Sequence, residues 1–130
     1  MNRKPLFEAN VNASSIAASV SNTLAVTVTH NAGGPFTIES FCISYDGSSG
    51  QESVTCELQD TQSNRKLIVG NMTLGTIGHD RTSARPALFR QLKDPIVIAS
   101  GQSVQLYLST PSGVTISAQD ITLALQGFQE

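Results

Sequence analysis

Acid–base chemistry near neutral pH depends most often on histidine, and this chain has two of them, His30 and His79. His79 precedes Asp80 and Arg81, an order in which a carboxylate can orient the imidazole ring. His30 ends an apolar segment beside a glycine pair, which predicts a polar residue at the surface. A hydrolase also needs an activated nucleophile, and the sequence has neither a serine in a G-x-S-x-G elbow nor a second histidine near His79. We therefore expect no catalytic residue and no enzymatic activity.

The two cysteines, Cys42 and Cys56, are equally distant from Ser49, which lies in a predicted turn. A hairpin with a symmetric register would place the two cysteines opposite each other. A register slipped by one residue would instead turn the apolar side chains of both strands, 41–45 and 54–58, to the core and would separate the sulfurs. Burial of several apolar side chains outweighs one bond, so we expect free thiols. Two distant histidines and two cysteines lack any zinc spacing, and no glycine-rich phosphate loop precedes a helix. We expect no metal and no cofactor.

The overall composition is that of a neutral surface. The chain has 130 residues and a formal net charge of −2, and only 14% of its residues are charged. A large surface of hydroxyl and amide groups is typical of a protein that another subunit covers. Without a basic excess we expect no binding to nucleic acid, and no apolar run approaches the roughly 20 residues that span a bilayer. The positively charged start lacks a following apolar segment, so we expect no secretory signal.

Alternation of apolar and polar residues predicts the elements that must hold these side chains. Val104, Leu106 and Leu108 alternate with polar residues, and the segment 121–128 repeats the pattern. This period of two, interrupted by Gly and Pro, is typical of half-buried antiparallel strands. We expect a single all-β domain over residues 1–130, an antiparallel β-sandwich of jelly-roll type with eight or nine short strands. The expected strands cover residues 6–11, 24–30, 36–45, 54–58, 66–69, 95–99, 104–108, 114–116 and 121–128.

Several local features have specific expectations. Residues 1–5 form a polar arm before the first strand, and residues 12–19 form a strand or a loop. Phe36 and Ile38 change phase relative to Phe41 and Ile43, which predicts a β-bulge near residues 39–40 that turns both pairs to the core. Residues 75–85 form the longest irregular stretch, followed by an extended segment 86–89.

The second half of the chain resembles the small head proteins of tailed bacteriophages over roughly residues 58–128. The likeness includes Leu58-Gln59-Asp60 and 64–67, Arg85-Pro86 with 95–102, residues 109–113, and the ending 121–128 with its Leu-x-Gly-aromatic pattern. The resemblance implies a capsid decoration (cement) protein, a β-sandwich that is often trimeric and clamps neighbouring major capsid subunits from outside. Such proteins have no active site, so the resemblance implies no catalytic residue.

We therefore predict a virion structural protein on the capsid exterior that is assembled in the host cytoplasm. Its expected partners are the major capsid protein and further copies of itself, most simply in a trimer. The protein would use few charges, many hydroxyl and amide groups, and exposed strand edges. The predicted partner-binding residues are those of the arm and of the irregular loop: Asn2, Arg3, Lys4, Pro5, Leu6, Phe7, His79, Asp80, Arg81 and Arg85. The alternative is a glycan-binding module of a tail fibre or spike, although the chain has no Trp and its two tyrosines lie on different strands.

Overall fold

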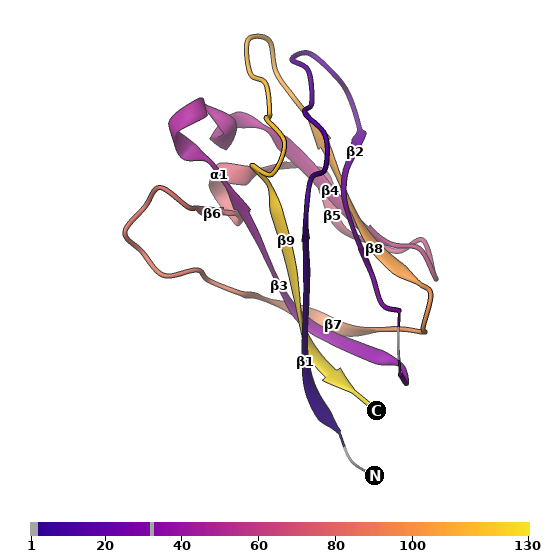
Figure 1. The fold of residues 1–130 in the computed structure, drawn as a ribbon. Coiled ribbons are helices and arrows are strands. Elements are labelled where there is room, and N and C mark those ends of the chain that lie inside the picture. Colours follow the sequence, from indigo (N-terminus) through magenta and orange to yellow (C-terminus); the bar gives the residue numbers. More distant parts are fainter. Residues whose placement is uncertain (1–2, 32) are drawn as a thin grey trace.

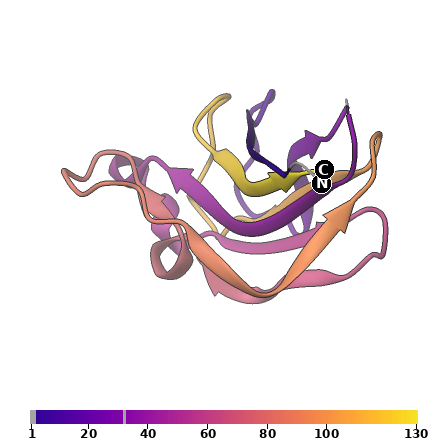
Figure 2. The same cartoon turned by 90° about the horizontal axis from the view of Figure 1, so that it is seen from below.

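The protein folds as a β-sandwich of two sheets, seen from two directions in Figure 1 and Figure 2. The computed structural model describes residues 3–31 and 33–130. The strands are β1 (Lys4–Val11), β2 (Thr23–Thr29), β3 (Phe36–Tyr45), β4 (Thr55–Asp60), β5 (Lys66–Thr73), β6 (His79–Asp80), β7 (Arg90–Ile98), β8 (Ser103–Ser109) and β9 (Thr122–Gln129). The helical elements are short: η1 (Gly47–Ser49), η2 (Gln51–Ser53) and α1 (Leu74–Ile77). The all-β class expected from the sequence is confirmed.

The order of pairing is that of a jelly roll. β1 pairs with β9, β2 with β8, β3 with β7 and β4 with β5, all antiparallel. The first half of the chain thus runs against the second half, and this long double strand is rolled into two sheets. One sheet has the order β1-β9-β3 with β7 and β6 both beside β3, and the other has the order β2-β8-β4-β5.

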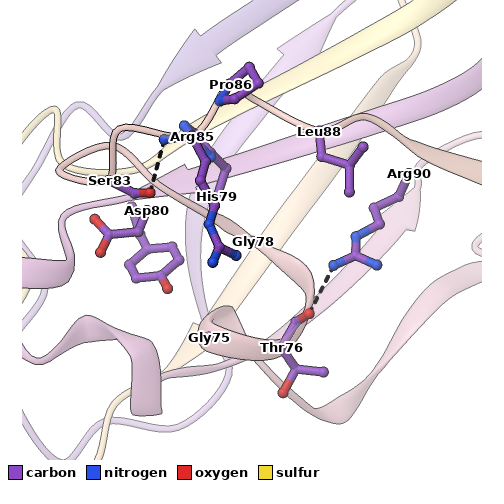
Figure 3. A pocket seen from close by; sticks show the side chains of 11 residues that line it. Gly75, Thr76, Gly78, His79, Asp80, Ser83, Arg85, Pro86, Leu88 and Arg90 are labelled. Atoms are coloured by element: carbon purple, nitrogen blue, oxygen red, sulfur yellow. Dashed lines mark hydrogen bonds between the residues drawn. The ribbon is translucent and has the colours of Figure 1, made fainter.

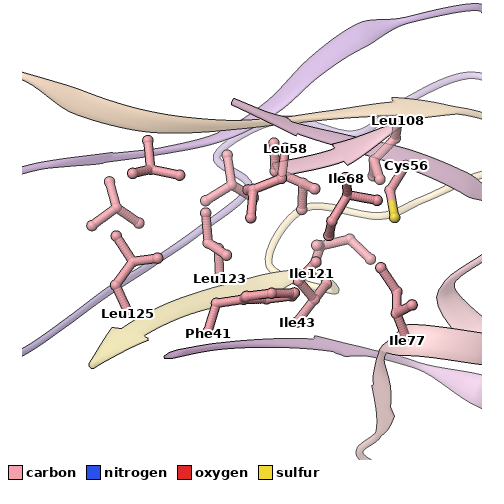
Figure 4. Packing of buried hydrophobic residues seen from close by; sticks show 14 of the residues in the cluster. Phe41, Ile43, Cys56, Leu58, Ile68, Ile77, Leu108, Ile121, Leu123 and Leu125 are labelled. Atoms are coloured by element: carbon pink, nitrogen blue, oxygen red, sulfur yellow. The ribbon is translucent and has the colours of Figure 1, made fainter. Parts of the chain in front are cut away.

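The apolar residues that alternate along each strand meet between the two sheets, as Figure 4 shows for part of the core. The predicted β-bulge in β3 is present. Between the pairs Ile38–Gly127 and Ser40–Gln126, β3 advances by two residues and β9 by one, so Glu39 is the extra residue. Because of this bulge, Ile38 and Phe41 both reach the core although their spacing is odd.

The predicted hairpin between Cys42 and Cys56 is wrong. β3 and β4 belong to different sheets, because η1 and η2 lead the chain from one sheet to the other. Cys56 faces the core, whereas Cys42 lies on the opposite side of its sheet, beside Ala124 of β9. The two thiols are free, as expected, but because the layers separate them and not because the register slips.

Other boundaries also differ from the expectation. Lys4 and Pro5 belong to β1 and pair with Gln129 and Phe128, so the arm predicted over residues 1–5 is largely a strand. Residues 114–116 form no strand but a single bridge between Ile16 and Ile116. The segment 86–89 is irregular, and β7 starts directly after it, earlier than predicted. The stretch 75–85 contains most of α1 and the two residues of β6.

Two edge regions have features that weaken strand-to-strand association. The Asn10 side chain of β1 donates to the Thr27 carbonyl of β2 at 2.9 Å. On the far side of the five-stranded sheet, β7 advances by five residues between the pairs Ile96–Ile38 and Gln91–Ser40 while β3 advances by two, so this edge strand is bulged. Bulges and bonded edges hinder the addition of a further strand. In the four-stranded sheet, β5 pairs with β4 and forms the outer strand.

Candidate interaction surface

The structure brings a predicted contact residue, Phe7, against Phe89, a residue far away in the sequence that was not predicted as a contact. The ring of Phe7 in β1 meets the ring of Phe89, just before β7, edge to face with 5.9 Å between centroids. β9 and β3 lie between β1 and β7, so the two rings reach toward each other across the outer face of the five-stranded sheet. The small residues Ala124 and Cys42 lie side by side between them and are buried, which leaves room for the rings. An aromatic pair thus covers the middle of this face.

Two large apolar side chains at or next to this pair are exposed. Phe7 is 58% exposed, and Leu88, which precedes Phe89 and lines the cleft beside α1, is 63% exposed, although such side chains are usually buried. We define the aromatic ledge as Phe7, Leu88 and Phe89. Phe7 is one of the contact residues predicted from the sequence, whereas Leu88 and Phe89 are not. Their only signal is that two large apolar residues lie in a segment without strand alternation.

The loop 81–89, which bears two of the three ledge residues, projects away from the sandwich in Figure 1 and Figure 2, but both of its ends are fixed. At the start, the Asp80 carboxylate accepts hydrogen bonds from Gly47 N at 3.0 Å, Thr82 N at 2.9 Å and Thr82 Oγ1 at 2.6 Å. These bonds, those from Thr82 foremost, hold the pKa of Asp80 below its ordinary value. Arg81 donates to the Gln119 carbonyl at 3.3 Å. Asp80 and Arg81, predicted as partner contacts, are thus used within the chain.

At the other end of the loop, Arg90 donates to the carbonyls of Thr76 at 2.9 Å and Ile77 at 3.3 Å. These carbonyls belong to α1, whose last carbonyls have no helical partner, so the guanidinium satisfies them. Between loop and α1 lies a cleft of about 510 Å³, into which Arg85 extends toward Gly78 (Figure 3). Among the residues that the structure describes, none forms an ion pair with Arg85, so its charge faces solvent.

His79 lies in β6, half-buried, and its strand neighbour in β3 is Ser44. Within the described ranges, no side chain or backbone group hydrogen-bonds to its ring, so the residues that flank it do not form a nucleophile–base pair.

The predicted N-terminal contact residues have three different environments. Arg3 places its guanidinium 4.5 Å from the centroid of the Phe128 ring and 3.9 Å from a Glu130 oxygen. Lys4 and Pro5 are exposed in β1, whereas Leu6 packs against the core. Asn2 lies outside the described residues.

His30 corrects another expectation, because it is buried and not at the surface. Its side chain is 1% exposed, with Nδ1 3.2 Å from Glu8 Oε1 and Nε2 2.7 Å from the Gly34 carbonyl oxygen. The ring also packs against Phe36, with 5.5 Å between centroids. The sequence missed this environment because residues 8 and 30 are on neighbouring edge strands of two different sheets.

The outer face of the four-stranded sheet is chemically different. It bears an ion pair between Lys66 Nζ and Glu57 Oε1 at 3.0 Å, and the Tyr107 hydroxyl donates to Gln105 Oε1 at 3.0 Å. Most of this face is polar, and its polar groups bond to one another, although Leu24, the strand neighbour of Tyr107, is exposed there. The face that includes the aromatic ledge is therefore the better candidate for a protein contact, because interface centres are poor in charge and rich in aromatic residues.

The fold is that of a jelly-roll β-sandwich. Comparison of the chain with known protein families, with curated protein sequences and with solved structures found no match. Within the described residues, no group of three or more His, Cys, Asp or Glu side chains is placed to hold a metal ion. No helix in the described ranges is long and apolar enough to cross a membrane.

Proposed function

We propose that this protein is a virion structural protein that decorates a capsid: it binds the outer surface of the shell of major capsid protein and stabilises it. The observation that supports this role most directly is the aromatic ledge, an exposed apolar group on a rigid support. Viral capsid domains are among the proteins built on the jelly roll, but the fold also serves lectins and enzymes. The proposal therefore depends on the ledge and on the resemblance of residues 58–128 to phage head proteins.

The ledge has the properties of a binding centre. Its side chains come from β1 and from a loop fixed at both ends by Asp80 and Arg90, so binding costs little ordering entropy. Burial of exposed aromatic and aliphatic side chains against a partner supplies most of the energy in typical interfaces. The exposed Arg85 beside the ledge would sit at the rim, where charges steer association rather than strengthen it.

A decoration protein also gains from repetition. If three copies join and each bears one ledge, weak single contacts add up through the high effective concentration of the second and third sites. We propose a homotrimer on this ground. Static light scattering of the purified protein should give three times the mass of 13.8 kDa. A monomer at all concentrations would contradict the trimer but leave the ledge contact standing.

The direct experiment is co-sedimentation with shells assembled from the major capsid protein of the same genome. Leu88→Ser removes the most exposed ledge residue, and Leu24→Ser, at a 46% exposed leucine of β2, is the matched control. We expect the Leu88 variant to bind tenfold more weakly or worse, as for an interface hot spot, and the control to bind like the unchanged protein. Absence of co-sedimentation by the unchanged protein, or equal losses in both variants, would refute the proposal.

Truncation gives a second test with a structural limit. Residues 4–7 belong to β1 and pair with β9, so their deletion would damage the fold. Deletion of residues 1–3 leaves β1 whole and asks only whether the first residues contribute to the contact. Unchanged occupancy of the shell would confine the contact to the ledge and its loop.

A further inference from the structure

The outer face of the five-stranded sheet has a second feature on the side toward the chain ends, next to the aromatic ledge, since Phe7 is the strand neighbour of Gln126. A hollow of about 330 Å³ lies there, lined by Pro5, Glu39, Ser40, Gln91, Gln126, Gly127 and Phe128. Gln126, Ser40 and Gln91 are direct neighbours across β9, β3 and β7, so two amides flank one small hydroxyl in a row. Pro5 and Phe128 are neighbours across β1 and β9 and form an apolar wall beside this row.

The β-bulge makes the hollow. Glu39 is the residue without a counterpart in β9, and it stands beside Ser40 on the outer side while Ile38 and Phe41 remain in the core. Bulges often re-aim a side chain in this way next to a binding site. Gly127 is required at the same point, because a Cβ there would overlap the carbonyl oxygen of Thr37. The ending Leu-x-Gly-aromatic of the chain thus supplies both a glycine for the bulge and two lining residues, Gln126 and Phe128.

The polar groups of this hollow are not used inside the protein. Across the described ranges, the side chains of Glu39, Gln91 and Gln126 have no hydrogen-bond partner, and Glu39 forms no ion pair. By contrast, the side-chain amide of Gln105 on the other sheet accepts a hydrogen bond from the Tyr107 hydroxyl. A carboxylate and two amides offer several acceptors and donors in one small area, with a negative rather than a positive charge.

We propose that this hollow binds a neutral sugar residue of a glycan. Neighbouring sugar hydroxyls match a carboxylate and planar amides, which can bond them in pairs, and the less polar side of a sugar ring matches the wall of Pro5 and Phe128. The inference does not depend on capsid binding, since the hollow is complete within one chain.

The test is a titration of the isolated ¹⁵N-labelled protein with glucose, galactose, mannose and N-acetylglucosamine, followed by NMR and extended on a glycan array. We expect saturable shifts of the side-chain amide signals of Gln91 and Gln126 at millimolar concentrations of at least one sugar. Gln126→Ala should weaken binding about tenfold, as for the loss of one or two hydrogen bonds, whereas Gln59→Ala on the other sheet should change nothing.

Two results would overturn the proposal: no saturable shift with any sugar together with a blank array, or shifts that centre on Gln59 and survive Gln126→Ala. Because no capsid is present in this experiment, its failure says nothing about the decoration role. Conversely, failure of co-sedimentation with shells leaves the sugar titration interpretable.

Discussion

The buried contact between His30 and Glu8 should be one of the strongest polar contributions to stability. It joins β1 of one sheet to the end of β2 of the other, at the edge where the two sheets meet. His30 has both ring nitrogens opposite acceptors, the Glu8 carboxylate and the Gly34 carbonyl. A ring nitrogen that holds a proton donates it to the acceptor opposite, so either tautomer makes a buried hydrogen bond with one of the two acceptors.

The expected cost of His30→Ala follows from these contacts. Removing a side chain and leaving a buried polar group without its hydrogen bond costs about 1–3 kcal/mol. His30 faces two acceptors and is 1% exposed, so we expect the upper end, about 3 kcal/mol. The loss includes the packing of the ring against Phe36. With a slope of about 2 kcal/mol per molar urea, the unfolding midpoint should fall by roughly 1.5 M.

Urea unfolding followed by far-UV circular dichroism measures this shift. Lys66→Ala is the matched control, because it breaks the Glu57 pair on a side chain that is 52% exposed and should cost about 0–1 kcal/mol. A change below about 1 kcal/mol for His30→Ala, or equal changes in both variants, would show that the buried pair does not hold the sheets together.

Three further predictions concern thiol chemistry, the bulge and the loop. Burial raises the pKa of Cys56 to about 12, so its thiol should resist alkylation at pH 8 until the protein is unfolded. The free energy of unfolding should fall as pH rises above the ordinary thiol pKa of 9.0, because only the unfolded thiol ionises there. Rapid labelling of the native protein would contradict this prediction. Gly127→Ala should destabilise the protein by about 1–3 kcal/mol in urea unfolding, because the methyl group meets the carbonyl of Thr37 and the strands must shift; an unchanged midpoint would refute the need for glycine. The pKa of Asp80 is lowered, so its contribution to stability is present above the ordinary value of 3.8 and is lost as pH falls through the lowered pKa. Protection of the amides in the loop 81–89, measured as hydrogen exchange relative to the intrinsic rate at each pH, should be lost only below that lowered pKa. A loss of protection already near pH 5 would contradict the role of the Asp80 carboxylate.

The sequence alone was sufficient for the class of fold and for one fine detail. Alternation in 104–108 and 121–128 predicts half-buried strands because side chains point to opposite faces with a period of two. The phase change between Ile38 and Phe41 predicts the bulge, since one extra residue is the only way to keep both in the core. These features are local, so the residues that determine them are close in the sequence.

Which strands pair, and therefore which side chains meet, was decided by the tertiary structure. The hairpin predicted for Cys42 and Cys56 failed because neighbours in the sequence were assumed to be neighbours in a sheet, whereas a jelly roll pairs the two halves of the chain. For the same reason the burial of His30 was missed. The contact of Phe7 with Phe89 and the row of Gln91, Ser40 and Gln126 join segments separated by dozens of residues, and no local pattern records such distances. Residue types and strand periods are thus determined by the sequence, while the aromatic ledge and the hollow exist only because the rolled double strand places distant residues on one face.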